Sequence, residues 1–249
     1  MRSELDDRRA ARRKRVAASE AGDEKSDGAI VRKLPPGRHG LTREQVAESQ
    51  RQRLFDAIAH LSSEHGYNGF SIADVVRRAG VSRATFYELF RNKEECFVGA
   101  IELQLRRLMN AVAPAFREAD EWPDRVENAI AALLDFIVEE PEYARMSMLE
   151  AYAAGPAAYD RYSTGWRLFI AMMDEGRNYA RFALPPNTGR AALGAAEQLI
   201  VDEMLAGRTH RVRTLLPTIL FVILLPYLGM EEALLRSRAA AERRQSAVA

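Results

Sequence analysis

Arg83, Thr85 and Tyr87 are the residues whose types and spacing best suit a specific binding chemistry. A guanidinium group can donate two parallel hydrogen bonds to a guanine edge, and the hydroxyls of Thr and Tyr can donate to phosphate oxygens. Ala84 is small and lets the backbone approach a partner closely. These side chains suit the recognition of double-stranded DNA, provided that a rigid helix presents them.

Two short helices joined by a three-residue turn are predicted around these side chains. The first begins at Ser71, which forms a capping box with Asp74, and ends at Gly80, a residue suited to a left-handed position. Ser82 can cap the second helix. The apolar positions at helical spacing are Ile72, Val75, Val76 and Ala79 in the first helix and Phe86, Leu89 and Phe90 in the second. This pattern predicts a helix-turn-helix, and an ordinary helical hairpin is the alternative.

Residues 54–105 resemble the N-terminal domain of the tetracycline-repressor-type (TetR) family of bacterial transcription regulators. The resemblance rests on the segment Gly66-Tyr-Asn-Gly-Phe-Ser-Ile-Ala-Asp-Val-Val and on Ala79-Gly-Val-Ser-Arg-Ala-Thr-Phe-Tyr-Glu-Leu-Phe-Arg-Asn-Lys-Glu-Glu, followed by Cys96-Phe97. It implies a homodimeric repressor that binds an inverted-repeat operator and is released by a small effector held in a second domain. It also implies that Lys93 contacts phosphate.

The N-terminal residues add basic charge to this predicted DNA-binding region. The net charge of the chain is +1, but residues 1–53 hold 14 Lys and Arg against 9 Asp and Glu. We predict a disordered basic tail over residues 1–41, and we expect Arg38 in this tail and Arg43 just after it to lie near phosphates or the minor groove. The alternative is a solvated tail without a role. Ser71 and Ser82, at the two helix starts, complete the predicted contacts with Arg83, Ala84, Thr85, Tyr87 and Lys93.

Helical periods and breakers continue to the end of the chain, which predicts an all-α protein. Residues 42–100 are expected to form the helix-turn-helix domain, opened by Thr42 with Gln45, and residues 101–243 an effector-binding and dimerisation domain. Asn92 is expected to cap a linking helix from Lys93 to about 118. The later helices are predicted at 122–139, 142–154, 157–182, 188–206, 212–228 and 230–243, with Thr188 as a possible cap.

An aromatic stripe in the predicted helix 157–182 is the candidate effector site. Tyr162, Trp166, Phe169 and Met173 recur at helical spacing, and Met146 and Tyr152 can face them. Aromatic faces, flexible thioethers and few charges favour a hydrophobic or aromatic ligand over a phosphorylated one. Plain core packing is the alternative.

The run 215–228 is apolar all round, so both of its sides need cover. It is shorter than the roughly 20 residues of a membrane span and holds two prolines, and we therefore expect no membrane insertion. We predict that Leu216, Leu220, Ile223 and Tyr227 pair with a second copy across a two-fold axis. The alternative is a central helix buried within a monomer.

No enzyme, metal or cofactor signature is found in the sequence. Cys96 is the single cysteine, and the four histidines, His39, His60, His65 and His210, are scattered. The first residues lack the apolar core of a signal peptide, so a cytoplasmic protein is expected. Two rivals remain: a TetR-fold protein without an effector, controlled by a protein partner or organising DNA, and an enzyme with an attached helix-turn-helix. The operator, the target genes, the effector and the sign of regulation stay open.

Overall fold

The structure is a computed structural model that describes residues 42–248, with the backbone alone for 244–248. Within that range the chain forms ten α-helices, three short 3-10 helices and no strand, which confirms the all-α prediction. The tail predicted for residues 1–41, and Arg38 within it, lie outside the described residues.

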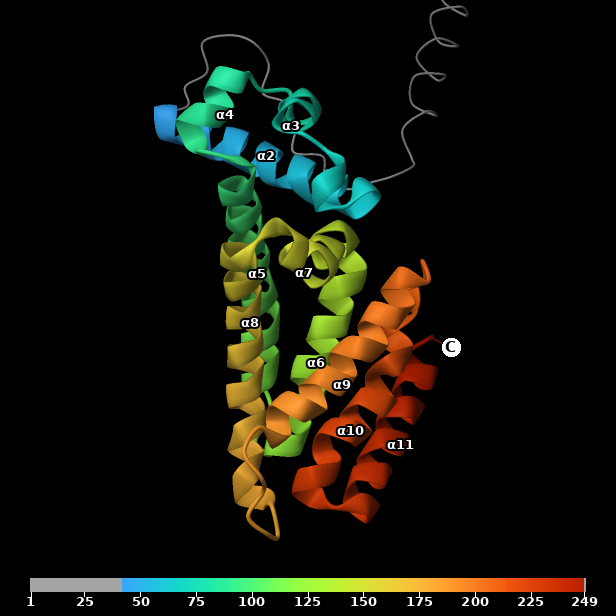
Figure 1. Cartoon of the computed structure of the whole chain (residues 1–249). Helices are drawn as coiled ribbons and strands as arrows, with labels where there is room; N and C mark the ends of the chain where they lie inside the picture. The colour runs from blue at the N-terminus through green and yellow to red at the C-terminus, as the bar shows by residue number, and fades with distance from the viewer. Residues whose placement is uncertain (1–41, 249) are drawn as a thin grey trace, which may run out of the picture. The chain divides into compact units, whose positions relative to one another are not determined.

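Four helices make the N-terminal part (Figure 1). They are α2 (Arg43–His65), α3 (Ile72–Ala79), α4 (Arg83–Leu89) and α5 (Lys93–Arg117), with the 3-10 turn η1 (Tyr67–Gly69) before α3. The side chains that accept a hydrogen bond from a first-turn amide are Thr42, Ser71, Ser82 and Asn92. Gly80 has φ 63° and ends α3 in the left-handed region. The predicted starts and stop of the helix-turn-helix are therefore confirmed.

The capping box of α3 makes a small part of the stability sensitive to acid. Asp74 accepts hydrogen bonds from the amide and hydroxyl of Ser71, which lower its pKa from 3.8 to about 2. Because the folded pKa is depressed, this stabilisation is fully present above about pH 4 and is lost as the pH falls through about 2. We expect Asp74→Asn to flatten the unfolding free energy between pH 4 and 2, measured by denaturant titration; an unchanged slope would contradict this assignment.

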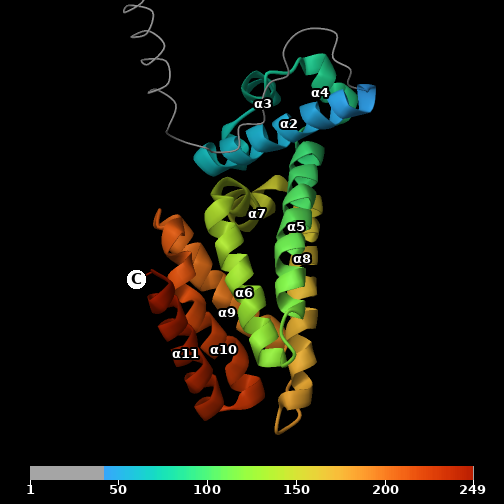
Figure 2. The same ribbon diagram turned by 180° about the vertical axis from the view of Figure 1, so that it is seen from behind.

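The remaining helices form the C-terminal part (Figures 1 and 2). They are α6 (Trp122–Glu139), α7 (Pro141–Ala154), α8 (Pro156–Asp174), α9 (Thr188–Leu205), α10 (Leu216–Leu228) and α11 (Met230–Val248), with the 3-10 helices η2 (Glu175–Tyr179) and η3 (Thr209–Leu215). α5 lies against both α6 and α8, while α10 packs along α11.

The predicted boundaries of three helices and the predicted cap at Thr188 were wrong; one of these helices, predicted at 230–243, continues to Val248 as α11. The helix predicted at 157–182 ends at Asp174 and tightens into η2, where Gly176 passes so close to Trp122 that a Cβ on it would lie 2.2 Å from the indole ring. The helix predicted at 212–228 begins at Leu216, because residues 209–215 are 3-10. Thr188 is the first residue of α9 and does not cap it, since its hydroxyl donates to the carbonyl of Pro185.

The buried side chains form two hydrophobic clusters, and α7 takes part in both. One cluster contains side chains of the four helices α2, α3, α4 and α5, together with Tyr143 and Met146 of α7. The other cluster contains side chains of α6, α8, α9, α10 and α11 and of the C-terminal half of α5. It also includes Ala144 of α7. α7 follows the predicted domain boundary at residue 100, yet Tyr143 and Met146 pack it into the cluster of the N-terminal helices α2, α3, α4 and α5.

The segment Thr209–Leu228 is the one described stretch long and apolar enough to cross a membrane by length and composition. In the structure it is broken into η3 and α10, and six side chains of α10 are buried within the helical core. Burial of these side chains against the neighbouring helices accounts for the apolar character of α10.

Candidate DNA interface and ligand pocket

Helix α4 presents a polar face to solvent and anchors its other face in the core. The ring of Phe86 is completely buried, whereas Tyr87 is 50 % exposed and stands edge-on to it, with ring centroids 5.5 Å apart. Arg83 and Ala84 are exposed and Thr85 is half-buried. The guanidinium of Arg83 forms no hydrogen bond or ion pair with any residue that the structure describes. Its donors are therefore free for an external partner, on a helix that Phe86 and the Ser82 cap hold in place.

The other predicted DNA contacts lie around α4. Ser71 and Ser82 are exposed at the starts of α3 and α4, where each side chain also caps its helix. Arg43 is exposed in the first turn of α2. Whether these side chains contact DNA stays a prediction.

Lys93 has an internal role that the sequence did not indicate. Its ammonium donates to the carbonyl oxygens of Tyr67 at 2.7 Å and Phe70 at 2.9 Å, and it lies over both aromatic rings, 4.1 and 4.5 Å from their centroids. Partial burial lowers the pKa of Lys93. Lys93 therefore fixes the α2–α3 turn to the start of α5, and one of its three N–H groups remains for a phosphate.

Helix α7 is hydrogen-bonded to α2 and to the α2–α3 turn. Glu150 of α7 accepts a hydrogen bond from the backbone amide of Tyr67 at 2.8 Å. The hydroxyl of Tyr143 donates to Asp56 of α2 at 2.7 Å, and burial beside that carboxylate raises the pKa of Tyr143. These contacts join α2 and the α2–α3 turn to a helix whose Ala144 and Met148 face the interior of the C-terminal part.

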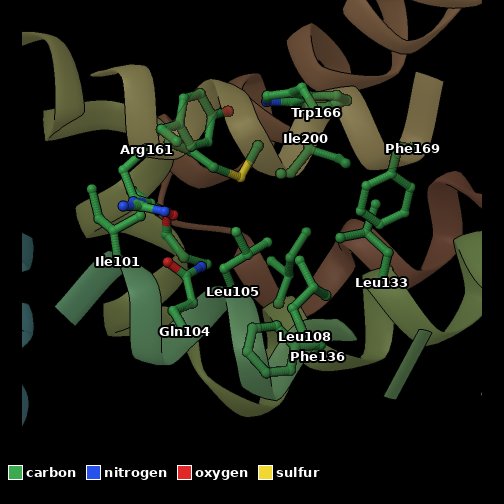
Figure 3. Close-up of a pocket in the computed structure, with 16 residues that line it drawn as sticks. Ile101, Gln104, Leu105, Leu108, Leu133, Phe136, Arg161, Trp166, Phe169 and Ile200 are labelled. Atoms are coloured by element: carbon green, nitrogen blue, oxygen red, sulfur yellow. The ribbon is translucent and has the colours of Figure 1, made fainter. Parts of the chain in front are cut away.

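That interior contains an apolar cavity of about 70 Å³ between α5, α6, α7 and α8 (Figure 3). Its walls are mainly aliphatic and aromatic: Leu105 and Leu108 of α5, Leu133 and Phe136 of α6, Met148 of α7, and Trp166 and Phe169 of α8. Figure 3 shows Gln104 and Arg161 together on one side, away from Phe169. The cavity therefore has an apolar body with polar groups on one side.

The polar groups beside the cavity differ in their partners. Gln104 is 8 % exposed, and its side-chain amide forms no hydrogen bond with the described residues. Arg161 pairs with Glu102 at 2.7 Å and remains half-exposed. Because Gln104 lines the cavity and its side-chain amide has no partner among the described residues, it suits a ligand that brings a hydrogen-bonding group to this side.

The predicted effector residues are divided among three surroundings. Tyr162, Trp166 and Phe169 line the cavity. Met146 and Met173 are fully buried in the two hydrophobic clusters and do not line it. Tyr152 is 70 % exposed on a second hollow. The lining residues of α5 and α6 were missed, although Ile101, Leu105 and Leu108 follow the helical spacing of a buried stripe.

The side chains predicted for the dimer interface lie inside the chain's own core. Leu216, Leu220, Ile223 and Tyr227 are all at most 3 % exposed. These side chains are buried because α6, α9 and α11 pack around α10. The outward face of α10 carries instead the half-buried apolar residues Phe221, Val222, Leu225 and Leu228, beside the exposed Leu234 and Leu235 of α11. Those six residues, which we call the outward apolar face, are partly or fully open to solvent and can therefore be reached by a partner.

No metal or redox site stands out among residues 42–248. No group of three or more His, Cys, Asp or Glu side chains is placed there to hold a metal ion. Cys96 is fully buried, and burial raises the pKa of its thiol. A buried, protonated thiol is a core residue rather than a nucleophile.

Comparison with known proteins finds similarity to bacterial regulators in part of the chain. Residues 54–100 match the family model of bacterial regulatory proteins of the tetR family. The transcriptional activator FasR of Mycolicibacterium smegmatis is 24 % identical over 124 residues, 50 % of this chain and 57 % of that protein. The nucleoid occlusion factor SlmA of Haemophilus influenzae is 25 % identical over 103 residues, 41 % of this chain and 47 % of that one. The chain thus spans about half the length of the curated relatives it matches.

Solved structures share the fold over a longer range. The fatty acid degradation regulator FadR of Bacillus halodurans has a TM-score of 0.64 at 17 % identity, covering 78 % of this chain and 97 % of that one. FadR of Bacillus subtilis, solved in complex with stearoyl-CoA, has a TM-score of 0.53 at 17 % identity, with coverages of 72 % and 98 %. At these identities the likeness shows the fold alone.

Proposed function

We propose that this chain, whose residues 54–100 match the tetR family model, is a homodimeric transcription regulator that binds an inverted-repeat operator through α4 and is released by a small apolar ligand. The observation that carries the DNA-binding part is the exposed, unpaired Arg83 on a helix fixed by the buried Phe86. Ser71, Ala84, Thr85, Tyr87 and Lys93 surround it as further contacts. Repression and a cytoplasmic location belong to the same proposal.

Footprinting on fragments of the source genome tests the DNA-binding part. We expect a protected inverted repeat, with half-sites about one helical turn or a whole multiple apart, because two α4 helices related by a two-fold axis meet successive major grooves. Protection without any repeat would contradict the dimeric arrangement, and the absence of protection would contradict operator binding.

The ligand part rests on the cavity. Its apolar body and the unpartnered Gln104 suit a hydrophobic molecule with one hydrogen-bonding end. FadR of B. subtilis, which shares the fold, was solved in complex with stearoyl-CoA, and this supports a fatty acyl chain as the first ligand class to test. Tyr162, Trp166 and Phe169 would contact the acyl chain of such a ligand. The same side chains would suit an aromatic ligand equally well.

The small size of the cavity gives a mechanism for release. An engineered cavity of about 150 Å³ accepts benzene, so a cavity of about 70 Å³ must widen before such a ligand enters. Widening separates α8 from α5 and α6. The turn before α8 lies against the start of α5, since a Cβ on Gly155 would lie 2.8 Å from a carboxylate oxygen of Glu94. A ligand that binds the widened state better shifts the population towards it and moves the start of α5, beside α4.

Filling the cavity is expected to remove the ligand response while sparing DNA binding. Ser147 lines the cavity, and its hydroxyl donates only to the carbonyl of Ala144 in its own helix. In Ser147→Leu the larger side chain occupies the space, so operator release by a C8–C18 series of fatty acids should need at least about tenfold more ligand. Electrophoretic mobility shifts with increasing fatty acid measure this.

Ala153→Leu is the matched control, because Ala153 is exposed on the same helix. It should respond as the wild type does. An unchanged response in Ser147→Leu would contradict the assignment of the cavity as the ligand site.

A second candidate function is favoured by the match to SlmA, a nucleoid occlusion factor. In that case the chain would bind DNA without a small effector, and the cavity of about 70 Å³ would be a packing defect. Many dispersed sites in genomic footprinting, together with no release by any member of the fatty acid series, would favour this function.

A further inference from the structure

A second hollow lies on the other side of α8 from the apolar cavity. This groove has a volume of about 410 Å³ and is formed by α8 and α9 with Tyr152 of α7. Tyr162 and Trp166 line both spaces and therefore form a wall between them. The groove differs from the cavity in chemistry, because a carboxylate, two arginines and four aromatic rings line it.

The carboxylate of the groove, Glu197 of α9, has no cationic partner. It is half-buried and accepts a hydrogen bond from the hydroxyl of Tyr162. No Lys, Arg or His in the described part of the chain forms an ion pair with it, and burial raises its pKa. A carboxylate can accept about four hydrogen bonds, so most of its capacity is unused. Burying a charge without a partner is unfavourable, and a cation entering the groove would relieve that cost.

The aromatic rings add a second attraction for a cation. The rings of Tyr152 and Tyr159 lie with centroids 4.3 Å apart and planes tilted by 33°, and Tyr152 is 70 % exposed. Tyr162 and Trp166 stand edge to face, with centroids 6.3 Å apart. The faces of such rings carry negative charge density and attract ammonium groups.

The arginines are less favourably placed to hold an anion. Arg167 is exposed and donates to the hydroxyl of Thr164 in its own helix at 2.6 Å. Arg190 is exposed in the first turn of α9. The more deeply placed charge is the negative one, on Glu197.

We propose that this groove is a second ligand site, separate from the apolar cavity, and that it binds an organic ammonium cation with Glu197 as counter-ion and the tyrosines and Trp166 as an aromatic wall. The site does not depend on the fatty acyl ligand proposed for the cavity. Because Tyr162 and Trp166 are shared, a cation in the groove acts on one wall of the cavity.

Fluorescence of Trp166 tests this site directly. Trp122→Phe is the parent protein, so that Trp166 is the remaining tryptophan. Benzyltrimethylammonium is the probe, benzyl alcohol is its neutral counterpart and phenylacetate its anionic one, all at constant ionic strength. We expect a saturable change with the cation only. No saturable change with the cation, or a preference for phenylacetate, would overturn the proposal.

Glu197→Gln then identifies the counter-ion, since glutamine keeps the size of the side chain and an acceptor for Tyr162. The affinity for the cation should fall at least about tenfold. Asp202→Asn, which removes a charge from an exposed position on the same helix, should leave it unchanged. Equal losses in both variants, or no loss in Glu197→Gln, would overturn the assignment of Glu197.

A third variant keeps the test decisive if Glu197→Gln does not fold. Tyr152→Leu changes an exposed side chain and should weaken cation binding severalfold, while an unchanged affinity would contradict the aromatic wall. Operator release by fatty acids should persist in Glu197→Gln. Failure of cation binding alone therefore counts against the groove, and failure of fatty acid release alone counts against the proposed function.

Discussion

Ile223→Arg is expected to unfold the C-terminal helices rather than to yield soluble monomers. Ile223 is completely buried between α10 and its neighbours in the same chain. An arginine there would place an unpaired charge in a core without polar partners, at a cost of about 4 kcal/mol or more. In thermal unfolding followed by circular dichroism, the variant should either aggregate or no longer melt cooperatively. A folded variant with wild-type stability would contradict the packing of α10.

Leu225→Arg is the matched control on the same helix. Leu225 belongs to the outward apolar face and is half-buried, so the arginine can reach solvent and the fold should survive. If the outward apolar face forms the dimer interface, this variant should be a monomer by light scattering. A dimer of wild-type stability would place the interface elsewhere.

Arg83→Ala is expected to cost about 1–3 kcal/mol of operator binding at each half-site, or about 2–6 kcal/mol for a dimer on an inverted repeat. Arg83 has no partner among the described residues, so its removal breaks no contact within the fold. The thermal stability should stay at the wild-type value. Fluorescence anisotropy with operator and with mutated operator measures both affinity and specificity.

Arg106→Ala separates the loss of a contact from the loss of a charge. Arg106 is exposed on α5, away from the helix-turn-helix. Its replacement removes the same charge but should change operator affinity by less than about 0.5 kcal/mol. If both variants lose equal affinity, Arg83 contributes only general electrostatic attraction. If Arg83→Ala binds as the wild type does, α4 does not recognise the operator through this residue.

The DNA-binding helices could be predicted from the sequence because their signals are local. Ser71, Gly80 and Ser82 act on backbone groups within a few residues, and the structure confirms these helix ends. The role of Lys93 could not be predicted in this way, since its carbonyl partners lie 26 and 23 residues earlier in the chain.

The ligand cavity was only partly predictable, because one aromatic stripe meets several neighbours along its helix. Phe169 lines the cavity, whereas Met173, one helical turn later, is buried in the hydrophobic core. Met146 faces the DNA-binding helices because α7 packs against α2, a contact that no local pattern encodes.

The dimer residues could not be placed because α10 has no polar face. A helix that is apolar all round gives no indication of which side faces inward. Only the packing of α6, α9 and α11 distinguishes the buried Ile223 from the half-buried Leu225.

Reciprocal binding tests whether the cavity and the operator are coupled. Binding of the best fatty acid should be measured by calorimetry without and with saturating operator, and operator affinity without and with that fatty acid. Linkage requires the two affinities to fall by the same factor, expected between about 5-fold and 150-fold. We expect equal factors in the wild type and neither effect in Ser147→Leu at the same fatty acid concentration. A fatty acid that binds equally well to free and operator-bound protein would contradict this coupling.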